Sequence, residues 1–519
     1  MISWRFKNKK NQIAKMFQAN PINTQKSPKT SLYLLLILGL SLLIHILCMT
    51  SSVLLVEEAY YWNYAQHLDF SYLDHPPMVA LLIKLSTLTF GTNELGVRMT
   101  ALICWMLTAF FSYKLADLIQ RGTGLYAVML LAVLPFFFVQ SLVITPDLPL
   151  IVCWAASLYC LYRALILNQS NYWYVAGIWL GAGMLSKYTI SLLGLATLFY
   201  VISTPTARLW FKRKEPYIGA LIAALIFSPV IYWNATHEWA SFIFQSGRRF
   251  TSTSPIRLHH VLGLSFIFLT PIGISGLWDL IKKNSPALSY ISTDTKKFIN
   301  IFTWIPWGVF ALFSLNHHIK LNWIGPTSLA IIPWFAILIA NIPQKHITWL
   351  KTATVLLCVY SAALLMMYAN KSELIQQKLF KEHIAWHTLT EKFHSLAKQI
   401  AIDTQLTPAF VPLDNYQIGS ELAFYQAKYL AKGTINQTYP TIGAHIFGGN
   451  SLMYRYWSTK EDSFGKPLIL IATNTEAFDD PGIKNQIIEQ SKLNKIQSIS
   501  QGQGIASTTY YYKIVQMKQ

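Results

Sequence analysis

Long apolar stretches separated by short polar segments make up most of the first 370 residues of the chain. The first stretch, Ser31–Thr50, has about twenty residues, the length at which an α-helix crosses the hydrocarbon core of a membrane. Similar stretches recur as far as Tyr368, so the pattern predicts a polytopic α-helical membrane protein with about 11 transmembrane helices, in a range of about 11 to 13. The later stretches are about Val97–Ile119, Leu125–Ile144, Leu148–Leu167, Tyr174–Ser186, Thr189–Ser203, Tyr217–Trp233, Leu258–Leu280, Phe298–Leu315, Trp323–Ala340 and Ile347–Tyr368.

Basic residues between the apolar stretches predict the orientation of the chain. Residues 1–30 contain seven Lys and Arg and no acidic residue, which indicates a basic cytoplasmic tail. With this tail inside, the basic segments around Arg121, Arg208–Lys214 and Lys282–Lys297 also fall in the cytoplasm. The loop that contains Glu57 and the turn at Asp147 then fall on the outer side.

The residues after position 369 have a different pattern. "IAWHTLTEKFHSLAKQI" (Ile384–Ile400) predicts an amphipathic helix, and "PLILIAT" (Pro467–Thr473) and "TTYYYKIVQM" (Thr508–Met517) predict strands. The sequence therefore predicts three parts: the tail at 1–30, a membrane part at 31–369 that includes an outer loop at 51–96, and a small outer α/β domain at 370–519.

Composition supports the membrane assignment. The chain is 53% hydrophobic and only 13% charged, with a mean hydropathy of +0.35, whereas soluble domains carry about 25% charge. The net charge is +19, but residues 370–519 contribute only +3 of it, from 15 basic and 12 acidic residues. The excess lies on the membrane part, so topology and anionic lipids explain it better than nucleic acid does.

The segment "VEEAYYWNYAQHLDFSYLDHPP" (Val56–Pro77) follows the first apolar stretch and is rich in carboxylates and aromatic rings. Glu57 and Glu58 at the membrane edge are candidates for a general base, although acidic residues also favour the start of a helix. Asp147 in "ITPDLPL" is a second candidate carboxylate on the same side, or simply the start of the next helix.

Basic residues at two outer positions depart from the positive-inside rule. Arg248 and Arg249 in "QSGRRF", and Lys320 in "NHHIKLNW", are candidates for binding a lipid phosphate. Arg257, in the same outer loop as the arginine pair, repeats the pattern. The alternative is that these residues bind no ligand and are an exception to the positive-inside rule of the kind that short loops tolerate.

No metal site is expected. The pairs His259-His260 and His317-His318 are poorly placed to chelate one ion together. None of the five cysteines forms a CxxC motif or lies in the C-terminal region, so neither a zinc site nor a disulfide framework is predicted there.

Several segments, in this order along the chain, resemble motifs of the bacterial family 39 glycosyltransferases, GT-C membrane enzymes related to protein O-mannosyltransferases and to the lipid A aminoarabinose transferase. Family members commonly have Asp-Glu-Ala-Tyr-Tyr-Trp where this chain has Glu57–Trp62, and Asp-His-Pro-Pro as at Asp74–Pro77. The other resembling segments are "FGTNELGVRM", "TPDLPL", "GMLSKYT", "PVIYWNATHEWASFIFQSGRR", "KLNWIGPTSLA" and "DNYQIGSELAFY".

The resemblance implies an inverting transfer of a sugar from a polyprenyl-phosphate donor, on the periplasmic side of a bacterial inner membrane. A lipid phosphate is already a good leaving group, so the chemistry requires no metal and no cofactor is expected. The acceptor is a glycolipid such as lipid A, another glycan or a protein. The catalytic acid of the family falls on Glu57, where a longer Glu replaces the usual Asp, and Glu58 is able to share the role.

The resemblance also assigns substrate-binding candidates. Asp74 lies in the shared Asp-His-Pro-Pro motif and is expected to contact sugar or acceptor. His75 stands where the aminoarabinose branch has a Lys that contacts donor phosphate, which weakens assignment to that branch. Tyr60, Tyr61 and Trp62 offer a platform for the sugar or hold the loop at the membrane interface.

Three other functions remain as alternatives. A lipid or sugar transporter would carry charged residues near the midplane and in paired repeats, whereas the candidate residues gather at one face. A polymerase or ligase of the O-antigen type would share the outer arginines. A binding or assembly protein would act through its outer domain alone.

Overall fold

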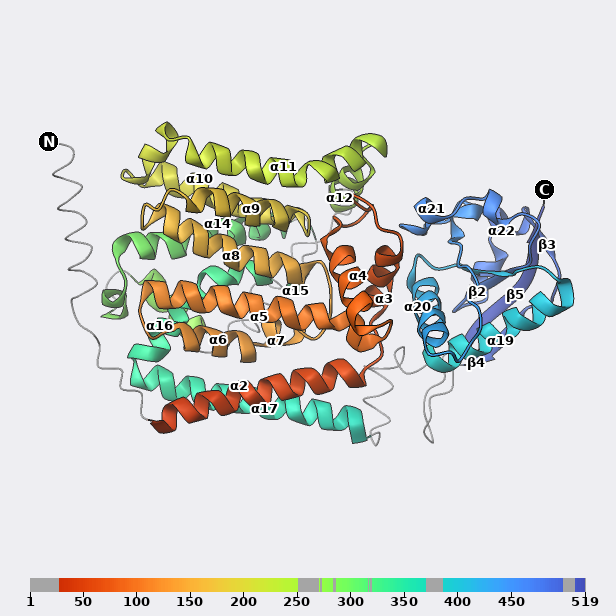
Figure 1. The fold of residues 1–519 in the computed structure, drawn as a ribbon, viewed down its shortest axis with the longest axis horizontal. Helices are drawn as coiled ribbons and strands as arrows, with labels where there is room; N and C mark the ends of the chain where they lie inside the picture. The colour runs from red at the N-terminus through yellow and green to blue at the C-terminus, as the bar shows by residue number, and fades with distance from the viewer. Residues whose placement is uncertain are drawn as a thin grey trace.

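The computed structural model describes residues 28–250, 270, 273–282, 286–315, 317, 320–369, 386–497 and 509–518. A bundle of helices forms the first part, and a mixed helix and sheet unit lies against one end of it (Figure 1). The basic tail at 1–27 and the candidates Arg257, His259, His260 and His318 lie outside the described residues. Arg248 and Arg249 belong to helix α12 (Ala240–Phe250), but their side chains are also outside the part of the chain that the structure describes.

The bundle consists of apolar helices that run side by side across the view in Figure 1. Helix α9 (Tyr172–Met184) packs against both α8 (Asp147–Leu165) and α11 (Glu215–Thr236), and α5 (Glu94–Ile119) packs against α8 and α6 (Gly124–Val133). These helices are α2 (Pro28–Ser51), α5 (Glu94–Ile119), α6 (Gly124–Val133), α7 (Pro135–Gln140), α8 (Asp147–Leu165), α9 (Tyr172–Met184), α10 (Ser191–Ser203), α11 (Glu215–Thr236), a helix at 273–281, α14 (Thr293–Phe313), α15 (Leu321–Ile324), α16 (Ile332–Asn341) and α17 (Pro343–Ala369). Short 3-10 turns are η1 (Tyr188–Ile190), η2 (Ala207–Lys212), η3 (Pro286–Tyr290) and η4 (Gly325–Ala330).

Five described helices are long and apolar enough to cross a membrane, and a pair bent by 54°, Asn322–Ala330 with Ile332–Asn341, makes a sixth. Several other predicted stretches are divided into shorter helices. The stretch 125–144 breaks between α6 and α7 at Leu134, because Pro135 cannot continue the helix. The pair α9 and α10 breaks at Lys187, as the short apolar stretches on either side of it predicted.

Glycines allow α9 and α11 to approach closely. A Cβ atom on Gly177 would lie 2.1 Å from the carbonyl oxygen of Gly219, and one on Gly219 would lie 2.5 Å from that of Trp173. Small residues of this kind are the usual means by which membrane helices pack at short distance. The contact fixes α11, and with it α12 (Ala240–Phe250), relative to the rest of the bundle.

Two short helices, α3 (Val56–Gln66) and α4 (Met78–Phe90), lie at the end of the bundle that faces the C-terminal unit (Figure 1). Helix α2 ends at Ser51 and the chain turns directly into α3. Nine of the eleven residues of α3 are buried, so this helix is packed between other elements and does not lie free on the surface.

The C-terminal unit contains the predicted helix at Trp386–Thr404 (α19) and the predicted strands at Leu468–Ala472 (β2) and Thr509–Met517 (β5). The sheet has the order β1-β2-β5-β3, and β4 also pairs with β5. Strands β1 and β2 are parallel, with Ala409 opposite Leu468, and the other pairs are antiparallel. The remaining elements are β1 (Ala409–Pro412), α20 (Gln417–Ala431), η5 (Ala444–Phe447), α21 (Tyr454–Trp457), η6 (Glu461–Ser463), η7 (Glu476–Asp479), α22 (Pro481–Lys484), β3 (Ile487–Glu489) and β4 (Asn494–Gln497).

Candidate active site

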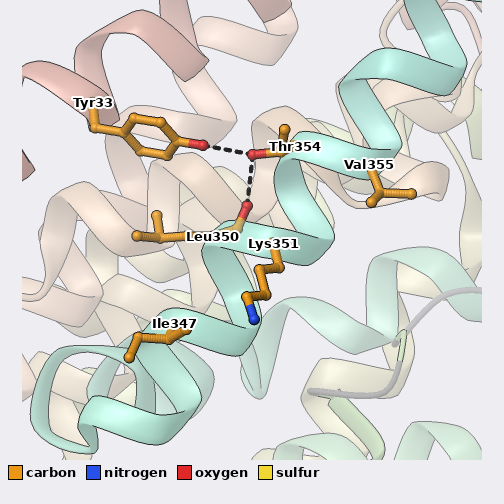
Figure 2. Close-up of a pocket in the computed structure, with 6 residues that line it drawn as sticks. All are labelled: Tyr33, Ile347, Leu350, Lys351, Thr354 and Val355. Atoms are coloured by element: carbon orange, nitrogen blue, oxygen red, sulfur yellow. Dashed lines mark hydrogen bonds between the residues drawn. The ribbon is translucent and has the colours of Figure 1, made fainter.

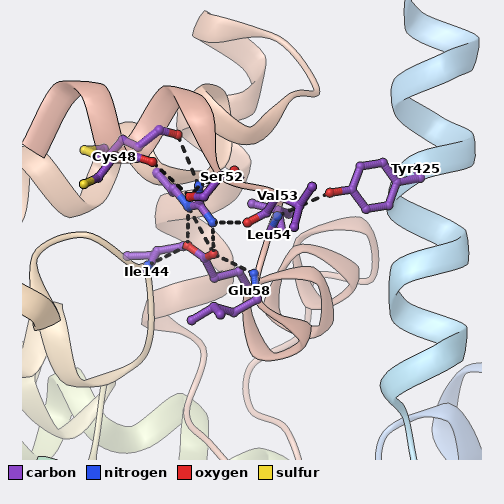
Figure 3. A network of polar contacts seen from close by, with 10 residues as sticks. Cys48, Ser52, Val53, Leu54, Glu58, Ile144 and Tyr425 are labelled. Carbon is purple, nitrogen blue, oxygen red and sulfur yellow. Dashed lines mark hydrogen bonds and ion pairs between the residues drawn. The ribbon is translucent and has the colours of Figure 1, made fainter. Parts of the chain in front are cut away.

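Glu58 is fully buried, and its carboxylate accepts hydrogen bonds from other groups of the protein. Its carboxylate accepts three hydrogen bonds of 2.6–3.1 Å from Arg98 and further bonds from the backbone N–H groups of Leu55 (2.9 Å) and Ile144 (3.1 Å). Arg98 also donates to the backbone oxygen of Met49 (3.2 Å) in the last turn of α2, and to those of Ser52 (2.7 Å) and Val53 (2.6 Å) just beyond it (Figure 3). The pair therefore joins α2, α3, α5 and the segment before α8.

Glu57, one position earlier on α3, is exposed. Within the part of the chain that the structure describes, its carboxylate has no hydrogen bond and no ion pair. Adjacent residues of a helix point about 100° apart, which explains why one glutamate faces the interior and the other does not. The two candidate bases are thus in opposite environments, and Glu57 alone has a carboxylate available to a substrate.

Asp147 is the first residue of α8, and it is buried. Its Oδ1 pairs with Nζ of Lys187 at 2.6 Å, and its Oδ2 accepts from the amide of Asn322 at 2.7 Å. Lys187 comes from the break between α9 and α10, and Asn322 from α15. Asp147 therefore fixes three parts of the bundle at the end where α3 lies.

The loop between α3 and α4 positions Asp74 and His75. The hydroxyl of Tyr64 donates to Oδ1 of Asp74, and the side chain of Gln245 on α12 donates to the backbone oxygen of Asp74. The ring of His75 lies edge-to-face against Tyr61, with 5.8 Å between centroids. The loop is thus held by α3 on one side and by α12 on the other.

Tyr61 lies among the predicted carboxylates. Burial, and after it the negative charges of Asp74, Asp147 and Glu57, hold the pKa of Tyr61 well above its usual value. Its hydroxyl therefore stays protonated, and it has no hydrogen-bond partner among the described residues. Carboxylates from α3, the α3–α4 loop and the start of α8 thus act on one buried, protonated phenol.

The neighbouring aromatic residues pack against the C-terminal unit. The hydroxyl of Tyr60 accepts a hydrogen bond from the backbone N–H of Met453 at 3.2 Å, and its ring lies 4.5 Å from that of Tyr416. Trp62 packs edge-to-face on Phe424 at 5.3 Å. Both side chains are at most 4% exposed, so these contacts fit the loop-holding role better than a sugar platform.

The basic candidates are only partly described. Lys320 is exposed just before α15, two residues from the Asp147 partner Asn322. Arg248 and Arg249 lie in the last turn of α12, the helix that reaches Asp74 through Gln245. The ring of His317 stacks on Phe313 at 4.5 Å. No group of three or more His, Cys, Asp or Glu is arranged for a metal ion among the described residues.

Sequence reasoning did not select two basic residues on which the site depends, Arg98 and Lys187. Both lie in segments that carry the family resemblance, "FGTNELGVRM" and "GMLSKYT". Each is a basic residue inside or between apolar stretches, where an unpaired charge is costly. Because an unpaired charge is costly there, the position of each residue could have predicted a buried carboxylate partner.

Helix α20 of the C-terminal unit docks on the start of α3. The backbone N–H of Leu54 donates to the hydroxyl of Tyr425, and the amide of Asn63 donates to the backbone oxygen of Ser420, both at 3.3 Å. Lys428 forms an ion pair with Glu94 at the start of α5. The C-terminal unit therefore holds the segment that carries Glu57.

Glu421 lies inside this interface, fully buried, and neither of its carboxylate oxygens has a hydrogen-bond partner within the described chain. Burial raises the pKa of Glu421 well above its usual value, and the negative charge of Glu58 raises it further, while Arg98 opposes the shift. A carboxyl group in such surroundings is neutral rather than ionised.

We expect the interface to weaken as Glu421 loses its proton. Because the pKa of Glu421 is higher in the folded protein than in the unfolded chain, folding takes up a proton above about pH 4.5. The stability contributed by the protonated group is complete at lower pH and is lost as the pH rises towards the folded pKa. Thermal unfolding from pH 4.5 to 8 should show that Glu421→Gln gains stability relative to wild type as pH increases. A difference between the two proteins that stays constant with pH would contradict this assignment.

Comparisons with known proteins agree with the fold and with the motifs. Residues 74–233 match the family described as dolichyl-phosphate-mannose-protein mannosyltransferase. The fold is similar to that of ArnT from Cupriavidus metallidurans, in the apo state (TM-score 0.63, 12% identity, 94% of this chain and 98% of that chain) and bound to undecaprenyl phosphate (TM-score 0.60, 14% identity, 92% and 97%).

A curated relative is the lipid A galacturonosyltransferase RgtD of Rhizobium johnstonii. The two chains are 26% identical over 219 residues, which cover 41% of this chain and 45% of that protein, less than half of either. Together the comparisons confirm the predicted resemblance to the family 39 glycosyltransferases. They also confirm an ArnT-like GT-C fold and a multi-pass membrane protein.

Proposed function

We propose that this protein is an inverting glycosyltransferase that moves a sugar from a polyprenyl-phosphate donor to lipid A or another glycolipid. The observation that carries the proposal is the site at one end of an ArnT-like bundle. There Glu57 is exposed with no hydrogen bond or ion pair among the described residues, and Tyr61 follows it one helical turn later on α3. The relative that acts on lipid A and the ArnT structure bound to undecaprenyl phosphate support the two substrate classes.

In the proposed reaction the acceptor hydroxyl attacks the anomeric carbon of the donor sugar. A new carbon–oxygen bond forms on the face opposite the phosphate, the bond to the phosphate breaks, and the polyprenyl phosphate leaves with the electron pair. Glu57 takes the proton of the acceptor, since Glu58 and Asp147 are already paired with Arg98 and Lys187. Asp147 acts as the second carboxylate of the site and keeps Lys187 and Asn322 in place.

Phosphate binding is proposed for His75, Arg248, Arg249 and Lys320. Positive groups here stabilise the charge that develops on the leaving phosphate, most strongly where water is excluded. A lipid phosphate leaves without help from a metal, so we propose that no metal or other cofactor is required. Tyr61 and Asp74 are proposed to contact sugar or acceptor, and Tyr60 and Trp62 to hold the loop.

We propose the finer topology on the same basis. The chain crosses a bacterial inner membrane about eleven times. Shorter or broken helices such as α9 and α10 form the spans that the long apolar helices do not account for. The tail at 1–30 lies in the cytoplasm. The site, within the membrane part at 31–369, and the domain at 370–519 lie in the periplasm.

The first test is mass spectrometry of lipid A and other glycolipids from a strain that lacks the gene and carries either an empty vector or the wild-type gene. We expect wild type to add the mass of one sugar. Tyr61→Phe should retain about 10–40% of that addition, because one hydrogen bond between uncharged groups contributes about 0.5–1.5 kcal/mol. If wild type modifies no lipid, glycan or protein, the proposal is wrong and transport becomes the leading function.

A further inference from the structure

A groove of about 600 Å³ lies between α2 and α17, at the end of the bundle opposite the candidate active site (Figure 2). The hydroxyls of Tyr33 on α2 and Thr354 on α17 are hydrogen-bonded at 2.6 Å within it. Tyr33 lies near the start of α2, whereas the chain enters α3 only after Ser51. At 1.5 Å per residue, the groove is roughly 27 Å from that entry. Its lining residues are Tyr33, Ile347, Leu350, Lys351, Thr354 and Val355.

Lys351 is the charged residue of this lining, and it lies in an unusual place. It is exposed in the span Pro343–Leu365, where the other exposed side chains are apolar or uncharged. Within the described chain it has neither an ion pair nor a hydrogen bond, unlike Lys345 six residues earlier, which pairs with Asp279 at 2.6 Å. A cation exposed to lipid needs an anionic partner or access to the interface.

The direction of the Lys351 side chain supplies that access. Figure 2 shows it running back along α17 towards Ile347, near the beginning of the helix. Long side chains on helices take this direction and bring the charge to the membrane surface. The ammonium therefore lies nearer the beginning of α17 than the hydroxyl pair of Tyr33 and Thr354 does, and we infer that it reaches headgroup depth.

The apolar surface next to the groove suits the acyl chains of a lipid. Towards the bilayer centre both helices present exposed apolar side chains, among them Leu36, Leu40, Val355 and Val359. A row of this kind suits an acyl chain that lies along the two helices. Residues 1–30, which lead into α2 and include its first turn, carry seven Lys and Arg, which favours anionic lipid in this leaflet.

We propose that the groove between α2 and α17 binds one anionic glycerophospholipid, with its phosphate on Lys351 and an acyl chain along the exposed apolar rows. The polyprenyl-phosphate donor is a poorer occupant, because its phosphate has to reach the neighbourhood of Glu57 at the other end of the bundle. The lipid would hold α2 against α17, and α2 leads directly into the segment that carries Glu57. This inference concerns binding and does not depend on the proposed reaction.

The test is native mass spectrometry of full-length protein in detergent with added phosphatidylglycerol or phosphatidylcholine. The variants are Lys351→Gln and, as a matched control, Lys214→Gln, which removes an exposed lysine before α11 at the same end of the bundle. We expect wild type and the control to retain phosphatidylglycerol over phosphatidylcholine. Lys351→Gln should retain about fivefold less phosphatidylglycerol. Equal unfolding temperatures of the three proteins in lipid-free detergent would show that the loss is not a folding defect.

Three results would overturn the proposal. These are equal retention of the two phospholipids by wild type, unchanged retention by Lys351→Gln, and loss from the control as large as from Lys351→Gln. A further arm uses undecaprenyl phosphate as competitor. If that lipid displaces phosphatidylglycerol in a Lys351-dependent manner at equal concentration, the groove belongs to the polyprenyl lipid and the assignment to a glycerophospholipid is wrong.

Discussion

Replacing Glu57 by glutamine is expected to reduce sugar transfer by a factor of about 10²–10⁴, the usual contribution of a general base, while the amount of folded protein stays the same. Glutamine keeps the size of the side chain but cannot take the proton of the acceptor hydroxyl. Folding should be unaffected because Glu57 is exposed and has no ion pair or hydrogen bond with other described residues. The measurement is transfer to isolated acceptor by purified protein, with the thermal unfolding temperature recorded in parallel.

The matched control is Glu57→Asp, which restores the residue that the resembling family commonly has at this position. We expect it to retain most of the activity, because the carboxylate is kept and only one methylene is lost. Wild-type activity in Glu57→Gln would exclude Glu57 as the base. A loss as large in Glu57→Asp as in Glu57→Gln would indicate that the position of the oxygen atoms decides the rate rather than proton transfer.

Replacing the adjacent Glu58 by glutamine should have the opposite effect: it should lower the stability of the protein and leave the activity of each folded molecule nearly unchanged. The substitution leaves the buried guanidinium of Arg98 without its negative partner, and breaking a buried pair in this way costs about 3–5 kcal/mol of stability. We expect a large fall in the thermal unfolding temperature and in the amount of protein in the membrane. Any loss of transfer should follow the loss of folded protein.

The two neighbouring glutamates thus provide a sharp comparison. Activity per folded molecule should fall in Glu57→Gln and remain close to wild type in whatever fraction of Glu58→Gln folds. Arg98→Met is a second variant for the same pair, since it leaves Glu58 buried and unpaired and should destabilise by a similar amount. If Glu58→Gln unfolds at the wild-type temperature and lacks transfer, Glu58 is a catalytic group and the structural role assigned to its pair is wrong.

At α3, the sequence predicted where the functional segment lies but did not separate the roles of its residues. The motif at Glu57–Trp62 predicted a functional segment just after the first membrane helix, and the structure places that segment at the end of the bundle. The motif did not separate the two glutamates, because their difference depends on Arg98, forty residues later. Likewise, the aromatic residues Tyr60 and Tyr61 look equivalent in sequence, yet the hydroxyl of Tyr60 accepts from Met453 and that of Tyr61 has no hydrogen bond with the described residues.

The sequence by itself determined the membrane class, the apolar helices, the α/β character of the C-terminal unit and the family resemblance. These features depend on local periodicity, hydropathy and short motifs, which need no knowledge of distant neighbours. Only the tertiary structure decided that Lys187 neutralises Asp147, that Glu421 on α20 is buried with no hydrogen-bond partner among the described residues, and that Glu57 is exposed. Such properties are set by charges and surfaces that meet across tens or hundreds of residues, where burial and pairing, rather than residue type, decide what a carboxylate does.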